Sequence, residues 1–465
     1  MREIFLTLYF FLLAYLAIYG LHLSWMIALY LKHRSNLPFI HSGHDSTPHV
    51  TVQLPIYNER LVASRLLNAV ASFDWPGNKL EIQVLDDSDD ETSVELDAEV
   101  RRLNLNGIDV HHIRRSKRIG YKAGALAEGM KVATGEFVAI FDADNLPRPD
   151  FLRLTTPHFV DSKIAVVQAR WSFINRNESL LCRAQALFLD AHFFIEQAAR
   201  CKGGLFMNFN GTAGVWRAEA IADAGGWRAD TLTEDLDLSY RAQMAGWKMH
   251  FLSDVDVPTE LPSSVRSFKS QQFRWTKGAI ETAIRNLPRL LRMPVSPRIK
   301  LGAFMHLTQK TVSIALLLLS IMLVPALYIR MEGGMIKLLL IDLPIFILGT
   351  GSMSLFYSLA HRRQNEDSSI LAGLILPLLS SIGIALSVNN SLAILAAFTG
   401  RHSTFVRTPK SGTDGKVSRV VPNSYRIKFD FSLKGELFLA FYSLSAVGMA
   451  ILTSVYISIP YLMTF

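Results

Sequence analysis

The sequence predicts an α/β domain joined to membrane-spanning helices, and three observations carry that prediction. Half of the 465 residues are hydrophobic and only 19% are charged, which is more apolar than is usual for a soluble enzyme. The apolar residues gather in long uncharged runs near both ends of the chain. Between residues 50 and 300, short apolar runs alternate with segments of helical spacing, which is typical of a mainly parallel sheet covered by helices on both faces.

The first apolar run covers residues 4–31 and ends at Lys32, His33 and Arg34. A helix of this length crosses a hydrocarbon core of roughly 30 Å. The run has no small-residue cleavage site, so we interpret residues 1–34 as an anchor and not as a signal peptide. The basic residues after it place the following domain in the cytoplasm.

The α/β domain is expected over residues 48–285. Its expected strands are 50–54, 80–85, 109–113, 137–141 and 164–167, and its expected helices include 60–72, 92–103 and 122–133. Polar clusters follow three of the strands, at residues 55–60, 86–92 and 142–145. Ligands of such sheets bind outside the carboxyl ends of the strands, so these clusters predict the site.

Asp142 and Asp144 follow a buried strand with one residue between them. Two carboxylates in this arrangement can hold a hard divalent cation that neutralises a diphosphate. A plain polar turn is the alternative.

The run Asp86–Asp90 holds more acids than a helix cap needs, so we expect Asp86 and Asp87 to bind a ligand; a solvated loop that caps the next helix is the alternative. Asp235 lies in a third acidic site. An attacking sugar hydroxyl needs a base to take its proton, and Asp235 is the candidate, although it also suits the start of a helix.

Cations and an aromatic side chain complete the candidate site. Arg274 could neutralise a diphosphate leaving group and Trp275 could stack on a sugar, but an interfacial anchor is the other interpretation of this segment. Lys122 is a further phosphate ligand, unless it is a solvated lysine at a helix start.

The net charge of +8 does not indicate nucleic-acid binding, because the basic residues lie largely beside the apolar runs, where anionic lipid accounts for them. The chain has only two cysteines, Cys182 and Cys201. Two are too few for a disulfide framework or a cysteine-rich metal site.

Six motifs together resemble the processive family-2 glycosyltransferases, in particular the cellulose-synthase-like mannan and glucan synthases and their bacterial relatives. The segments that carry the resemblance are Gly120–Leu126, Val167–Trp171, Asn210–Gly214, Gly225–Trp227, Thr233–Asp235 and Gln271–Trp275. The resemblance implies a GT-A-type, Rossmann-like fold and an inverting reaction that transfers a hexose from a nucleotide sugar to a growing β-linked polysaccharide. UDP-glucose is the first expectation for the donor, and GDP-mannose, giving a β-mannan, is the alternative.

The resemblance also implies roles for single residues. Asp86 and Asp87 would contact the nucleoside and Lys122 the donor. Asp142 and Asp144 would bind Mg²⁺ or Mn²⁺, and Asp235 would be the base. Three residues of one motif would contact the acceptor and the leaving group: Gln271, Arg274 and Trp275.

A gating loop is expected within residues 400–433, because Phe405, Thr408 and Lys410 match the pattern of cellulose synthases. Arg407 departs from that pattern. The loop and its flanking region carry eight basic residues, which the positive-inside bias keeps in the cytoplasm.

The C-terminal part, residues 286–465, is expected to hold interfacial helices and further spans. Runs 302–329, 334–360 and 434–463 are expected to cross the membrane. The run 369–399 contains Ser380-Ser381 and Asn389-Asn390-Ser391, so we expect it to stay on the cytoplasmic face as an interfacial or re-entrant helix.

The expected protein is thus an integral membrane enzyme of the plasma or inner membrane, with a nucleotide-sugar donor and a glycan or glycolipid acceptor. A non-processive transferase acting on a lipid and an inactive scaffold for glycan export are the alternatives. Partner subunits, linkage and primer are left open.

Overall fold

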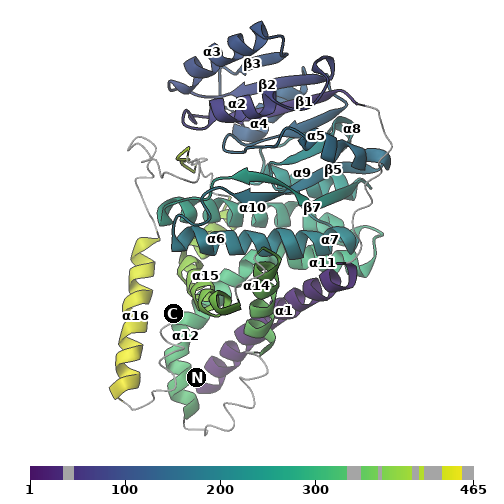
Figure 1. The fold of residues 1–465 in the computed structure, drawn as a ribbon. Coiled ribbons are helices and arrows are strands. Elements are labelled where there is room, and N and C mark those ends of the chain that lie inside the picture. The colour runs from purple at the N-terminus through teal and green to yellow at the C-terminus, as the bar shows by residue number, and fades with distance from the viewer. Residues whose placement is uncertain (35–46, 332–346, 365–368, 401–407, 413–431, 453–465) are drawn as a thin grey trace.

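A computed structural model describes residues 1–34, 47–331, 347–364, 369–400, 408–412 and 432–452. A sheet domain lies over a group of long helices (Figure 1). The strands are β1 Val50–Ile56, β2 Leu80–Asp86, β3 Val110–Arg114, β4 Phe137–Ile140, β5 Ile164–Phe173, β6 Gly214–Arg217 and β7 Lys248–Thr259. The helices of the domain are α2 Ala63–Ala71, α3 Thr92–Leu105, α4 Tyr121–Met130, α5 Phe151–Thr155, α6 Leu180–Asp190, α7 Ala198–Lys202, α8 Ala218–Asp223 and α9 Glu234–Met244.

The seven strands form one sheet in the order β3-β2-β1-β4-β6-β5-β7. Strands β1 to β4 pair in parallel, with Val50 of β1 opposite both Leu80 and Phe137. The chain builds outward from β1 to β3 and then returns to place β4 on the other side of β1. The order therefore reverses between β1 and β4, the place where open α/β sheets bind ligands.

The sheet is mixed and not mainly parallel throughout, because β6 runs antiparallel to both β4 and β5. Strands β6 and β7 are absent from the strands expected from the sequence. Strand β6 has only four residues, too few for a periodic signal. Strand β7 is long but is interrupted by Ser253, Asp254 and Asp256, which disguise its alternation.

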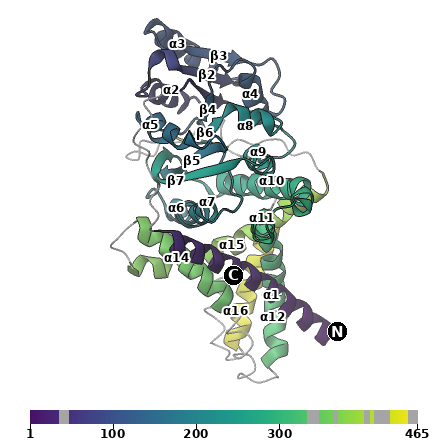
Figure 2. The ribbon, with the colours of Figure 1, turned by 90° about the vertical axis from the view of Figure 1, so that its right-hand side faces the viewer.

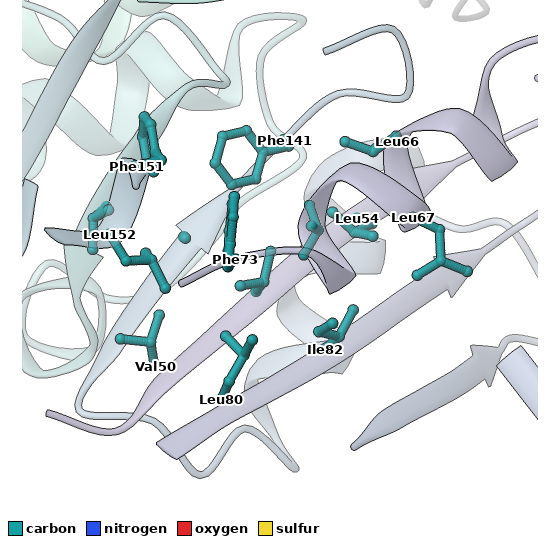
Figure 3. Close-up of a cluster of buried hydrophobic side chains, with 14 of the residues drawn as sticks. Val50, Leu54, Leu66, Leu67, Phe73, Leu80, Ile82, Phe141, Phe151 and Leu152 are labelled. Carbon is teal, nitrogen blue, oxygen red and sulfur yellow. The ribbon is translucent and has the colours of Figure 1, made fainter. Parts of the chain in front are cut away.

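Two hydrophobic clusters hold the sheet between layers of helices. One lies beneath α2 and α5, where Leu66, Leu67 and Phe151 pack on residues of β1, β2 and β4 (Figure 3). The other covers the opposite face, where Leu126 of α4 and Leu238 of α9 meet the fully buried Trp216. Helices on both faces fix the strand ends, and so they fix the loops that follow.

The helices below the domain are α1 Arg2–His33, α10 Val265–Arg292, α11 Pro297–Thr308, α12 Val312–Met331, α14 Ser352–Gln364, α15 Ser369–Phe398 and α16 Leu433–Leu452. Three described stretches are long and apolar enough to cross a membrane: Arg2–His33, Pro297–Ala326 and Leu378–Phe398. They indicate an integral membrane protein. The expected spans 334–360 and 434–463 lie partly outside the described residues.

Helix α15 lies directly below the domain and shares contacts with α10 and α12 (Figures 1 and 2). Leu379, a third of the way along α15, packs in the same cluster as Leu187 of α6, and Ile394 near its end packs on Ile280 of α10. The described second part of α15 therefore contacts the domain at two places. By length and apolarity its second part could also cross, so the expected sidedness stays a prediction.

The polar residues of α15 do not break it. Helix α15 is continuous through Asn389 and Asn390, which are buried against other helices and not exposed to lipid. The Asn389 amide donates to the Lys269 carbonyl of α10 at 3.1 Å. Neighbouring helices therefore satisfy the polar groups that set this run apart from a lipid-facing span.

Candidate active site

The loop after β4, residues 142–145, is held by hydrogen bonds within itself and to residues 211–212, which precede β6. The Asp142 amide donates to Asn145 Oδ1 at 2.9 Å and to Thr212 Oγ1 at 2.8 Å. Lys122, at the start of α4, donates to the Asp142 carboxylate and, at 2.9 Å, to the Gly211 carbonyl. Three segments that are far apart in the sequence, at Lys122, at residues 142–145 and at residues 211–212, therefore meet at Asp142.

Asp144 is the second acid of the pair, and it is far more enclosed. Its side chain is 4% exposed against 39% for Asp142. One carboxylate oxygen accepts from the Glu260 amide at 2.9 Å, from Thr259 Oγ1 and from Lys410 Nζ at 2.7 Å. Burial alone would raise the pKa of Asp144, but Lys410 and these hydrogen bonds hold it below its usual value.

A divalent cation fits this pair only if the donor completes its shell. Among the described residues, no group of three or more His, Cys, Asp or Glu side chains is arranged to hold a metal. Mg²⁺ commonly takes one or two carboxylates and fills its remaining positions with substrate phosphates and water. Asp142, which is 39% exposed, and Asp144 therefore stay the predicted ligands of a cation whose shell the donor would complete.

Asp235, at the start of α9, lies beside Gly211 on the same side as Lys122. Its Oδ1 accepts the Leu236 amide at 2.8 Å. A side chain at Gly211 would put its Cβ 2.8 Å from Asp235 Oδ2, and Gly211 has a φ of +80°, so only glycine suits this position. Burial and the neighbouring Glu234 carboxylate raise the pKa of Asp235 to about 7. Such a group is half ionised near neutral pH, as a general base should be.

Asp86 and Asp87 at the end of β2 already have partners. Asp86 is buried; it accepts the Ser88 amide at 2.8 Å and lies 3.0 Å from His112 Nε2. Although burial acts in the opposite direction, hydrogen bonds from His112 and Ser88 lower the pKa of Asp86 to about 2. Arg115 makes a two-pronged contact with Asp87. Both acids lie at the predicted strand end, and their contact with a nucleoside stays a prediction.

Helix α10 supplies the remaining predicted residues. Arg274 donates to Thr408 Oγ1 at 2.9 Å. Burial lowers the pKa of Arg274 to about 10, while Glu234 and Asp142 act in the opposite direction, which places its charge near the acidic site. Gln271 and Trp275 are partly buried on the same helix. Thr408 and Lys410 thus reach the site, whereas Phe405 lies outside the described residues.

Several contributing residues were missed from the sequence. Thr212 and Asn145 orient the Asp142 backbone, and Glu260 binds the segment that carries Lys410. His112, to which we assigned no role in the site from the sequence, bridges Asp86 and Asp97. The sequence offered one signal for His112: it lies on β3, the strand next to β2, whose end carries Asp86. Glu260 gave none, because its partners lie far away in the sequence.

A family model described as "Glycosyltransferase like family 2" matches residues 48–278. The matched segment contains the β1 to β7 sheet, the Asp142 loop and Asp235. The chain belongs to the family-2 glycosyltransferases. This match agrees with the resemblance that the motifs indicate.

The relatives of this family-2 glycosyltransferase include plant enzymes. It is 47% identical to glucomannan 4-β-mannosyltransferase 2 of Arabidopsis thaliana over 241 residues. That alignment covers 51% of this chain and 45% of the plant protein. It is 48% identical over 241 residues to glucomannan 4-β-mannosyltransferase 1 of rice, Oryza sativa, covering 51% and 46%. The alignments thus span a little under half of each plant enzyme.

A solved structure shares the fold. The mannosyltransferase of Pyrobaculum calidifontis, in complex with GDP-mannose and Mn²⁺, matches 83% of this family-2 glycosyltransferase and 100% of its own chain, with a TM-score of 0.51 and 18% identity. This likeness supports the GT-A-like architecture that the resemblance implies.

Proposed function

We propose that the chain transfers mannose from GDP-mannose to a growing β-1,4-linked mannan or glucomannan. The observation that carries the reaction type is the meeting of Asp142, Lys122 and Asp235 around the Gly211 loop. The sugar is inferred from the plant glucomannan mannosyltransferases, which are 47–48% identical over about the same part of the chain. UDP-glucose, the first expectation from the motifs, becomes the alternative donor.

Asp235 is the proposed base. Its carboxylate accepts the proton of the attacking acceptor hydroxyl, while that oxygen forms a bond to the anomeric carbon. The bond between the anomeric carbon and the diphosphate breaks on the opposite face, so an α-linked donor gives a β-linked product. Lys122 and Arg274 place positive charge beside the departing diphosphate, where it stabilises the charge that develops.

The other site residues bind and orient. A divalent cation, Mg²⁺ or Mn²⁺, held by Asp142 and Asp144, would supply Lewis-acid neutralisation of the diphosphate. Asp86 and Asp87 would hold the nucleoside end of the donor. Gln271 and Trp275 would contact the acceptor. Thr408 and Lys410 would contact the phosphates of the donor. The site would face the cytoplasm, where nucleotide sugars are made.

Purified protein in detergent or nanodiscs, given radiolabelled GDP-mannose, UDP-glucose and other nucleotide sugars in parallel, tests this proposal. We expect incorporation from GDP-mannose into a polymer that an endo-β-mannanase degrades. Incorporation from UDP-glucose alone would move the proposal to a β-glucan. Short lipid-linked products would indicate a non-processive enzyme, and no transfer from any donor would favour the inactive scaffold.

A further inference from the structure

The described segment Thr408–Gly412 is docked on the domain mainly through one carboxylate. Glu260 follows β7 directly and is 3% exposed. Its Oε2 accepts the Ser411 amide at 2.9 Å, the Ser411 hydroxyl at 3.2 Å and the Gly412 amide at 3.3 Å. Its Oε1 accepts from Arg65 of α2 at 2.9 Å, and its carbonyl accepts from Lys410 at 2.9 Å.

The backbone shape of the segment fits the same docking. Gly412 has a φ of +67°, and a Cβ there would lie 2.6 Å from the Leu61 carbonyl. A side chain at this position would both strain the backbone and push the segment away. The close approach to Leu61 is independent of the charges on Glu260 and Arg65, so two separate observations describe one built contact.

We propose that Glu260 is a positioning residue, which fixes Thr408–Gly412 so that Lys410 reaches Asp144 and Thr408 reaches Arg274. The same strand end presents the Glu260 amide to Asp144 at 2.9 Å, so one anchor sets both Lys410 and its acidic partner. Lys410 Nζ lies 2.7 Å from Oδ2 of Asp144, so its positive charge would stand beside any divalent cation that the same carboxylate holds. This inference rests on the proposed function for its catalytic consequence, but the docking itself does not.

A labelling experiment tests the docking without any donor. In a background with Cys182 and Cys201 replaced by serine, Ser411→Cys should react slowly with a soluble maleimide, because Ser411 is 5% exposed. Adding Glu260→Gln should speed labelling about tenfold or more. Glu136→Gln is the matched control, because Glu136 is 57% exposed and pairs with Arg217 away from this segment; it should change nothing. Equal rates in all three proteins would overturn the proposal.

Gly412→Ala is the second variant, since Glu260→Gln could impair folding by leaving Arg65 with a weaker partner. It leaves Glu260 and Arg65 intact and should also speed labelling of the cysteine at position 411. Unchanged labelling of a folded, monodisperse Gly412→Ala protein would contradict the docking.

Double-mutant kinetics test the consequence for the reaction. Glu260→Gln and Lys410→Met should each lower kcat/KM, and the double variant should be no worse than the poorer single variant, because both act through one contact. Lys410→Met should also tighten Mn²⁺ binding measured by paramagnetic resonance without donor. Additive losses, or unchanged Mn²⁺ affinity, would overturn the proposal. If no donor is turned over, labelling and Mn²⁺ binding still decide it, so its failure is distinct from that of the proposed function.

Discussion

Two aspartates, one buried at the end of β2 and one partly buried at the start of α9, have opposite environments. Asp86 at the end of β2 is surrounded by donors, the Ser88 amide and His112, and its pKa is lowered to about 2. Asp235 at the start of α9 has Glu234 beside it, and burial and that carboxylate raise its pKa to about 7. The same residue type is thus ionised throughout the neutral pH range in one place and is the proposed proton acceptor in the other. Carboxyl groups whose pKa values are pushed apart mark different roles.

The largest effect is expected at Asp142, the proposed metal ligand that Lys122 also contacts. Asp142→Ala removes a proposed metal ligand and the partner of Lys122, so transfer should fall to background while the protein stays folded. Excess EDTA should do the same, and added Mn²⁺ should restore activity. Full activity in excess chelator would contradict the metal assignment.

Asp235→Asn tests most directly whether Asp235 and Asp86 have different roles. It removes the proton acceptor and keeps the shape, so kcat should fall by about 10²–10⁴-fold, the usual contribution of a general base. Donor affinity, measured by equilibrium binding of the nucleotide sugar, should change little. Asp86→Asn is the comparison, and it should weaken donor binding more than it lowers kcat. The reverse pattern would exchange the two roles.

The pH dependence sharpens the same contrast. Asp235 must be ionised to act, so kcat/KM should fall by about tenfold per pH unit below about 7 and level off above it. The pKa of Asp86, about 2, predicts no contribution in this range. A rate profile that is flat from pH 5 to 8 in the unsubstituted protein would show that Asp235 is not the base.

The smallest effect is expected at His112. Burial lowers the pKa of His112, but hydrogen bonds to Asp86 and Asp97 outweigh it and raise the pKa. A raised histidine pKa adds stability that is complete below the unfolded value of about 6.5 and is lost as pH rises through the folded value. His112→Ala should cost about 1–3 kcal/mol by leaving Asp86 short of a donor. Chemical denaturation at pH 6 and pH 8.5 measures it, and the cost should be smaller at pH 8.5.

The sequence could predict one end of the sheet better than the other. Strands β1 to β4 alternate with helices at short range, so their order and the loops at Asp86 and Asp142 follow from local pattern. Strand β6 has only four residues and β7 is broken by acids, and their places depend on pairings across the sheet. The role of Glu260 could not be read from the chain, because its partners Arg65 and Ser411 are separated from it by 195 and 151 positions.

Helix α10 has a mechanical consequence. Its 28 residues make a rod of about 42 Å at 1.5 Å per residue. Arg274 and Trp275 lie about a third of the way along it, and the helix packs against α15 beneath the domain. These two side chains are therefore carried by a continuous helix seated on an apolar helix, and not by a loop. Their position relative to the apolar helices should then stay the same during each transfer, whatever the length of the glycan already built.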